Sequence, residues 1–160
     1  MKFDGSISIS VGESRKDIHW KQKSLIWSAF TKELQTPIRT HETFEEYKSL
    51  PKARRDELKD VGGYVGGVLV GERRKAGAVR SRSLVTLDLD AVQDDPWEIV
   101  HWILSCAAVL YSTHSHSSEK PRYRLILPLA RSVSAEEYEP LARRIAQEIG
   151  IDACDDTTFE

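Results

Sequence analysis

An apolar run that ends in two carboxylates, residues 83–90 (SLVTLDLD), constrains the fold more than any other stretch of the chain. Its composition suits a β-strand, in which successive side chains point to opposite faces. The apolar side chains at the odd positions are therefore expected on one face of a sheet. Asp88 and Asp90 are expected side by side on the other face, where the strand ends.

Two carboxylates at this spacing repel each other unless a cation lies between them. Oxygen-rich pairs of this kind suit a hard divalent ion such as Mg²⁺ or Mn²⁺. The simplest interpretation is a metal site that contains Asp88 and Asp90. The alternative is a solvent-facing strand end with two capping aspartates.

The bulk properties indicate a single globular domain. A chain of 160 residues can enclose one core, and 40% hydrophobic with 30% charged residues is an ordinary globular composition. The formal net charge of −2 provides no overall positive field for nucleic acid, so such contacts need a local cluster. Residues 73–75 (RRK), with Arg80 and Arg82, form one.

The cysteines and the N-terminus predict a cytoplasmic protein. Cys106 is one of two cysteines and lies in an apolar run, which predicts a buried thiol in a reducing compartment. The N-terminus lacks an apolar segment flanked by positive charge, and no apolar run approaches ~18 residues, so we expect neither a signal peptide nor a membrane span.

The first third of the chain predicts an αβ segment. Residues 6–11 alternate polar and apolar, as in a half-buried strand, and residues 13–23 are expected as a loop. Apolar residues at helical spacing predict a helix over 24–34 that packs on the sheet. We expect residues 1–60 to be an N-terminal αβ extension of the domain that follows.

Five glycines lie within residues 61–71, and a basic turn follows at 73–77. Clustered glycines can cradle phosphate, but neither a following Lys-Ser or Lys-Thr nor a GxGxxG spacing is present. A strand with close backbone approach is therefore favoured. The basic turn is expected as a hairpin tip, and beside a metal site such a tip is well placed to meet phosphates.

Residues 61–160 are expected to form the core domain, and the predicted elements are strand 83–90, a helix from 95, strand 107–111, strand 122–129 and a helix over 134–150. This order predicts an α+β fold with an RRM-like sheet, whose helices cover one face and leave the face of Asp88 and Asp90 open. The tail after residue 150 is expected to begin another strand, and its abrupt end indicates a truncated chain.

Three short motifs lie in this core: Leu87-Asp88-Leu89-Asp90, Ser112-Thr113-His114, and an aspartate in 152–156. Their order and spacing resemble the archaeo-eukaryotic primase superfamily, which has a hydrophobic-Asp-hydrophobic-Asp strand, a Ser-x-His and a hydrophobic-Asp. Residues 111–128 look like the primase-polymerase domains of phage and plasmid replication proteins, which are often fused to a virulence-associated protein E-type helicase. The resemblance covers roughly residues 60–160.

Two assignments remain open within this resemblance. Asp156 is preferred for the third motif, because the following Thr-Thr-Phe looks like the lead-in to the strand that comes next in the family, with Asp152 and Asp155 as alternatives. His114 fits the Ser-x-His motif, and His116 lies close enough to replace it.

The resemblance implies metal-dependent nucleotidyl transfer from nucleoside triphosphates on a single-stranded DNA template. Mg²⁺ or Mn²⁺ would be held by Asp88, Asp90 and Asp156, and His114 would complete the catalytic set. The nucleotide would be bound by nearby polar and basic side chains, namely Ser112, His116, Arg122, Arg124, Arg73 and Arg74. A replicative helicase domain or protein is the implied partner.

Two other functions fit parts of the sequence. A rolling-circle nicking endonuclease has a His-hydrophobic-His metal site; His114 and His116 have that spacing, but Ser115 is not hydrophobic. Its candidate nucleophile, Tyr138, lies in a predicted core stripe. A non-catalytic module for single-stranded nucleic acid would place aromatic side chains on the open face, whereas Tyr123 is expected on the packed face.

Overall fold

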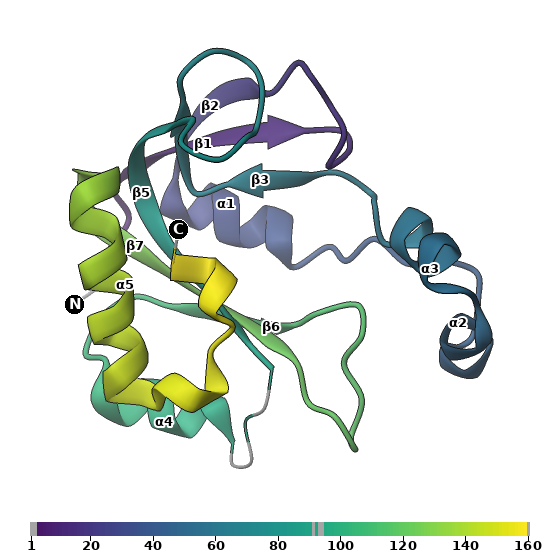
Figure 1. Ribbon diagram of the computed structural model, residues 1–160. Helices are drawn as coiled ribbons and strands as arrows, with labels where there is room; N and C mark the ends of the chain where they lie inside the picture. Colours follow the sequence, from purple (N-terminus) through teal and green to yellow (C-terminus); the bar gives the residue numbers. More distant parts are fainter. Residues whose placement is uncertain (1–2, 91, 93–94, 160) are drawn as a thin grey trace.

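The computed structural model describes residues 3–90, 92 and 95–159, and in these residues it has two antiparallel sheets and five α-helices, which confirms the α+β class (Figure 1). One sheet has the order β2-β1-β3 and the other β4-β5-β7-β6. The elements are β1 (Ser6–Gly12), β2 (Lys21–Ile26), α1 (Trp27–Leu34), α2 (Phe44–Ser49), α3 (Lys52–Leu58), β3 (Gly63–Val65), β4 (Gly67–Leu69), β5 (Val79–Leu89), α4 (Pro96–Ile103), β6 (Val109–Ser112), β7 (Tyr123–Ser134), α5 (Ala135–Ile149) and the 3-10 turns η1 (Ile151–Ala153) and η2 (Asp156–Phe159).

The larger sheet follows the predicted order β5-α4-β6-β7-α5, with β7 between β5 and β6. Both α4 and α5 cover one face of this sheet (Figure 1). On that face Leu87 and Leu125 pack in one cluster with Tyr138 and Ala142 of α5, and all four are at most 2% exposed. The predicted apolar side of β5 is therefore confirmed.

The opposite face of this sheet is only partly open, which corrects the expectation of a free face. Leu84 and Ile126 point to this side and pack with Ile9 of β1 and Phe30 of α1. An apolar side chain at the even position 84 makes the middle of β5 apolar on both sides, so a second layer covers it. Solvent reaches this face near the end of β5, beyond the covering layer.

The N-terminal segment joins the core through a second sheet instead of adding a strand beside β5. β1 pairs with β2 and with β3, and a serine pair links the two sheets: Ser83 Oγ donates to the Ser8 carbonyl at 2.6 Å and accepts from its N–H at 3.0 Å. The sequence did not predict β2, because its residues (KQKSLI) are polar and largely exposed. Consequently the first helix begins at Trp27 rather than at residue 24.

The glycine-rich stretch forms two short strands, one in each sheet, as β3 and β4. At Gly67 the backbone of β5 comes so close that a Cβ atom would lie 2.0 Å from the Ser81 carbonyl oxygen. This confirms the predicted close backbone approach.

Two other expectations differ from the structure. Residues 151–159 form η1 and η2 instead of starting a strand, and only Cys154 makes a bridge, to Leu89. Cys106 is exposed rather than buried, because α4 ends at Ile103 and leaves Cys106 in the connection to β6. None of the helices in the described residues has the length and apolar character needed to cross a membrane.

Glu137, at the N-terminus of α5, is expected to titrate far below an ordinary glutamate. The Arg131 guanidinium, 2.6 Å away, and the Ser134 N–H lower its pKa to about 2. A pKa lowered on folding stabilises the fold above the ordinary value of about 4.3, and this stabilisation is lost as the pH falls through the folded value. An NMR titration of the carboxyl carbon should show the low midpoint, and Arg131→Gln should raise it. An ordinary wild-type midpoint would contradict the contact.

Candidate functional site

The end of β5 presents two rows of charged side chains that run across the sheet. Asp88 lies opposite Arg124 of β7, and Arg124 lies opposite Tyr111 of β6. In the next row, Asp90 pairs with Arg122, just before β7 begins. Because side chains alternate along a strand, both rows lie on the face that points away from α4 and α5.

Both aspartates are held by arginines. Arg124 donates from Nε and Nη2 to the two carboxylate oxygens of Asp88, at 2.6 and 2.9 Å. Arg122 Nη1 lies 2.8 Å from Oδ2 of Asp90. The hydrogen bonds to Asp88 raise the pKa of Arg124 above its ordinary value, so this pair stays charged. The four side chains are 26–35% exposed, which lets a charged ligand reach them.

The chain after α5 brings a third carboxylate to this face. Cys154 bridges to β5, and the Asp155 N–H donates to the Asp88 carbonyl at 2.8 Å. Cys154 packs against the core behind the sheet, so side-chain alternation places Asp155 on the face of Asp88. The N–H and hydroxyl of Thr157 lower the pKa of Asp155, and the charge of Arg122 lowers it further.

Asp156, the preferred residue of the third motif, occupies a different place. It begins η2, and its charge, after burial, raises the pKa of the Cys154 thiol to about 11. Asp152 lies within η1. Of the three candidates, Asp155 is the one whose own N–H is hydrogen-bonded to β5 beside the aspartates, so the geometry favours the alternative that the sequence left open.

Ser112 and His116 flank the rows without joining them. Ser112 lies opposite Tyr123, so it faces the α4 and α5 side of the sheet rather than Asp88. His116 Nδ1 accepts from the Arg122 N–H at 3.2 Å, and its ring centre lies 4.8 Å from that of Tyr123. His116 therefore fixes the backbone of Arg122 at the start of β7.

His114 rests on the N-terminal segment. The ring of Tyr47 in α2 packs edge-on against the His114 ring at 4.5 Å, and its hydroxyl lies 3.5 Å from Ser115 Oγ. Tyr47 is 5% exposed. In Figure 1 the β6–β7 loop extends toward α2. Residues 1–60 therefore help to position the Ser-x-His segment.

Tyr47→Ala is expected to loosen the loop over residues 113–118. Losing an edge-on ring contact of about 1 kcal/mol should speed amide hydrogen exchange in the loop roughly 5- to 10-fold. Tyr47→Phe keeps the ring and should leave exchange close to wild type. Equal exchange in both variants and the wild type would show that the Tyr47 ring does not hold the loop.

The basic turn lies far from the carboxylates. Arg73 and Arg74 sit between β4 and β5, before Val79, and nine residues of one strand separate Val79 from Asp88, a span of about 30 Å. The Arg74 guanidinium lies 5.6 Å from the Trp20 ring instead. The predicted hairpin tip is present, but the structure places it at the opposite end of β5 from the expected metal site.

The three carboxylates do not form a ready cation site. Within residues 3–90, 92 and 95–159, no group of three or more His, Cys, Asp and Glu side chains is arranged to hold a metal ion. The oxygen donors of Asp88, Asp90 and Asp155 have the chemistry that Mg²⁺ and Mn²⁺ prefer. Two of these carboxylates are occupied by guanidinium groups, so a cation fits the donor set once Arg122 and Arg124 move.

Two tyrosines near Arg124 were missed by the sequence reasoning. Burial raises the pKa of Tyr64 in β3 well above its ordinary value, the nearby Tyr111 raises it further, and the charge of Arg124 opposes this. The position of Tyr111 follows only from the β6–β7 register, and Tyr64 reaches the site from the second sheet. Neither carries a local sequence signal.

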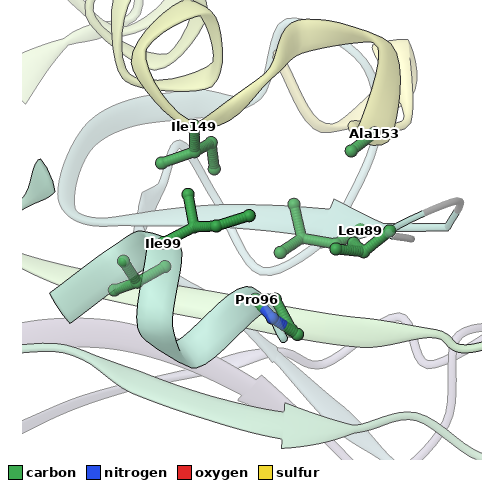
Figure 2. A pocket seen from close by; sticks show the side chains of 7 residues that line it. Leu89, Pro96, Ile99, Ile149 and Ala153 are labelled. Carbon is green, nitrogen blue, oxygen red and sulfur yellow. The ribbon is translucent and has the colours of Figure 1, made fainter. Parts of the chain in front are cut away.

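Behind the rows, the reverse face is closed by apolar packing. Leu89 lies between the two aspartates and, with Ile99, Ile149 and Ala153, lines a cavity of about 10 Å³ (Figure 2). A volume of this size is at the lower limit for one water molecule. The cavity is therefore a packing gap, and the candidate functional site is the charged face itself.

The sequence that builds this charged face matches a known family over its full length. A family model described as the VapE N-terminal domain matches residues 1–160. The chain belongs to this family. No curated protein and no solved structure matches it. The VapE N-terminal domain is associated with phage and plasmid replication, and its match includes residues 1–60, outside the stretch that carried the sequence resemblance.

Proposed function

We propose that this VapE N-terminal domain is a primase-polymerase of the archaeo-eukaryotic primase superfamily, which transfers nucleotides from nucleoside triphosphates on a single-stranded DNA template. The observation that supports this most is the gathering of Asp88, Asp90 and Asp155 with Arg122 and Arg124 on one partly exposed face. Carboxylates beside guanidinium groups provide partners both for a divalent cation and for phosphate oxygens.

Each side chain has a role in this proposal. Arg122 and Arg124 bind the triphosphate through their planar donors. The carboxylates Asp88, Asp90 and Asp155 would hold Mg²⁺ or Mn²⁺, which supplies charge neutralisation and a lowered pKa for the attacking 3′-hydroxyl. The rest of the rate comes from orienting the triphosphate against the template strand.

The partners follow from the same proposal. With a net charge of −2, the domain alone should bind single-stranded DNA weakly and with a strong dependence on salt. A replicative helicase domain or protein would then keep the domain on its template.

The burial of Tyr138 argues against a nicking endonuclease. Tyr138 is 2% exposed, and its hydroxyl lies within 3.4 Å of the Thr86 N–H and the Thr158 carbonyl. A tyrosine in this position cannot reach a DNA phosphate. The aromatic stacking expected of a binding-only module also has little support, because Tyr123 packs with the core cluster under α4 and α5.

A priming and primer-extension assay tests the proposal. The chain is incubated with single-stranded DNA, Mn²⁺ or Mg²⁺, and ribo- or deoxynucleoside triphosphates, with and without a primer. We expect template-dependent products that require both cation and triphosphate. Strand cleavage with a tyrosyl–DNA adduct would support the endonuclease, and DNA binding without synthesis would support the binding module.

A further inference from the structure

We propose that Arg122 and Arg124 are exchangeable counter-ions, which couple cation binding to triphosphate binding at the charged face. The inference rests on the proposed function and adds a form of regulation to it. In the free chain the arginines occupy the carboxylates. When cation and triphosphate arrive together, the cation takes the carboxylates and the guanidinium groups turn to the phosphates.

The ion pairs set the starting state. Arg124 binds both oxygens of Asp88, and Arg122 binds Asp90 at 2.8 Å, so two carboxylates are neutralised by two guanidinium groups. A cation that arrives alone must either displace a guanidinium or bind beside two positive charges. Both cost free energy, because a displaced guanidinium at a partly buried position is left without a partner.

A triphosphate that arrives alone meets the opposite problem. Its negative charges approach Asp88, Asp90 and Asp155, while the arginines that would bind it are already paired. When cation and triphosphate arrive together, every charge finds a partner. The planar fork of arginine accepts this exchange readily, because carboxylate and phosphate oxygens have similar spacing.

The exposure and position of the pairs permit the exchange. The four side chains are 26–35% exposed, so each arginine can rotate without unpacking the core. Both arginines belong to or adjoin β7, which is anchored to β5 by backbone pairing from Leu89 to Leu84. Only the side chains need to move, and they remain within reach of a ligand bound to the carboxylates.

Thermodynamic linkage makes the inference measurable. If a guanidinium competes with the cation, removing it must strengthen cation binding in the absence of nucleotide, and coupling of this kind typically amounts to roughly 5- to 150-fold in affinity. We therefore expect Arg124→Gln to bind Mn²⁺ alone roughly 10-fold more tightly than the wild type. Arg124→Lys keeps the positive charge and should stay close to wild-type affinity.

The experiment is a titration of the folded chain with Mn²⁺ alone, with free Mn²⁺ followed by electron paramagnetic resonance. Arg131→Gln is the matched control, since Arg131 pairs with Glu137 outside the site and should leave Mn²⁺ affinity unchanged. Asp88→Asn identifies the site by weakening binding. Circular dichroism melting verifies that each variant is folded, and Arg124→Lys serves as a second test where Arg124→Gln is unstable.

The outcomes separate this inference from the proposed function. Tighter Mn²⁺ binding by Arg124→Gln but not by Arg124→Lys supports the exchange. If Arg124→Gln binds Mn²⁺ no better than the wild type while Asp88→Asn weakens binding, the exchange is wrong and the catalytic proposal stands. If Asp88→Asn leaves Mn²⁺ binding unchanged even with dATP present, the proposed function itself fails and the exchange fails with it.

Discussion

Replacing both Asp88 and Asp90 by asparagine is expected to reduce template-dependent nucleotide incorporation by at least about 10³-fold. Asparagine keeps the size of aspartate and one acceptor oxygen, so Arg122 and Arg124 retain hydrogen-bond partners and the fold is preserved. The substitution removes the two negative charges that would hold a divalent cation. The initial rate of primer extension with Mn²⁺ and deoxynucleoside triphosphates measures the loss.

Asp56→Asn provides the matched control for this double variant. Asp56 also forms an ion pair, with Lys59 at 2.7 Å, and its side chain is 19% exposed, but it lies in α3. We expect its activity to remain near wild type, because such surface pairs contribute little. Wild-type incorporation by the folded double variant, or an equal loss in Asp56→Asn, would contradict a catalytic role for the charged face.

Gly67→Ala is expected to destabilise the fold by at least about 3 kcal/mol. The added Cβ would lie 2.0 Å from the Ser81 carbonyl oxygen and 2.9 Å from the Arg82 Cα, and both are backbone atoms of β5 that cannot rotate away. β4 would have to separate from β5 at the point where Ser10 Oγ also donates to the Gly67 carbonyl, at 2.9 Å. Urea denaturation followed by circular dichroism measures the effect.

Gly63→Ala is the control from the same glycine-rich stretch. No atom lies within 4 Å of a Cβ added at Gly63, and its φ is not in the positive range. We expect its free energy of unfolding to stay within about 1 kcal/mol of wild type. Similar stability of Gly67→Ala and Gly63→Ala would show that the close approach of β4 and β5 does not constrain the fold.

The sequence predicted the elements in which a strong local pattern agrees with the tertiary environment. β5 combines alternating apolar residues with terminal carboxylates, and α5 begins at a capping box formed by Ser134 and Glu137. The pairing of Asp88 and Asp90 on one face follows directly from strand alternation. These features need no knowledge of the partner strands.

The remaining features depend on contacts between distant segments. β2 is polar, so only its pairing with β1 makes it a strand. The role of Asp155 over Asp156 is decided by one bridge, between Cys154 and Leu89, that places alternate residues of the tail on opposite sides of the sheet. The arginine partners of Asp88 and Asp90 likewise follow from the β5–β7 register, which no local pattern specifies.

The most direct test of the central claim, that the charged face is the nucleotide site, is paramagnetic mapping by NMR. Mn²⁺ is added in small amounts to the ¹⁵N-labelled chain with dATP, and line broadening of each amide is recorded. The account predicts that Asp88, Asp90, Asp155, Arg122 and Arg124 broaden first. Broadening centred on the turn at 73–77, or the same pattern in the variant with asparagine at 88 and 90, would contradict it.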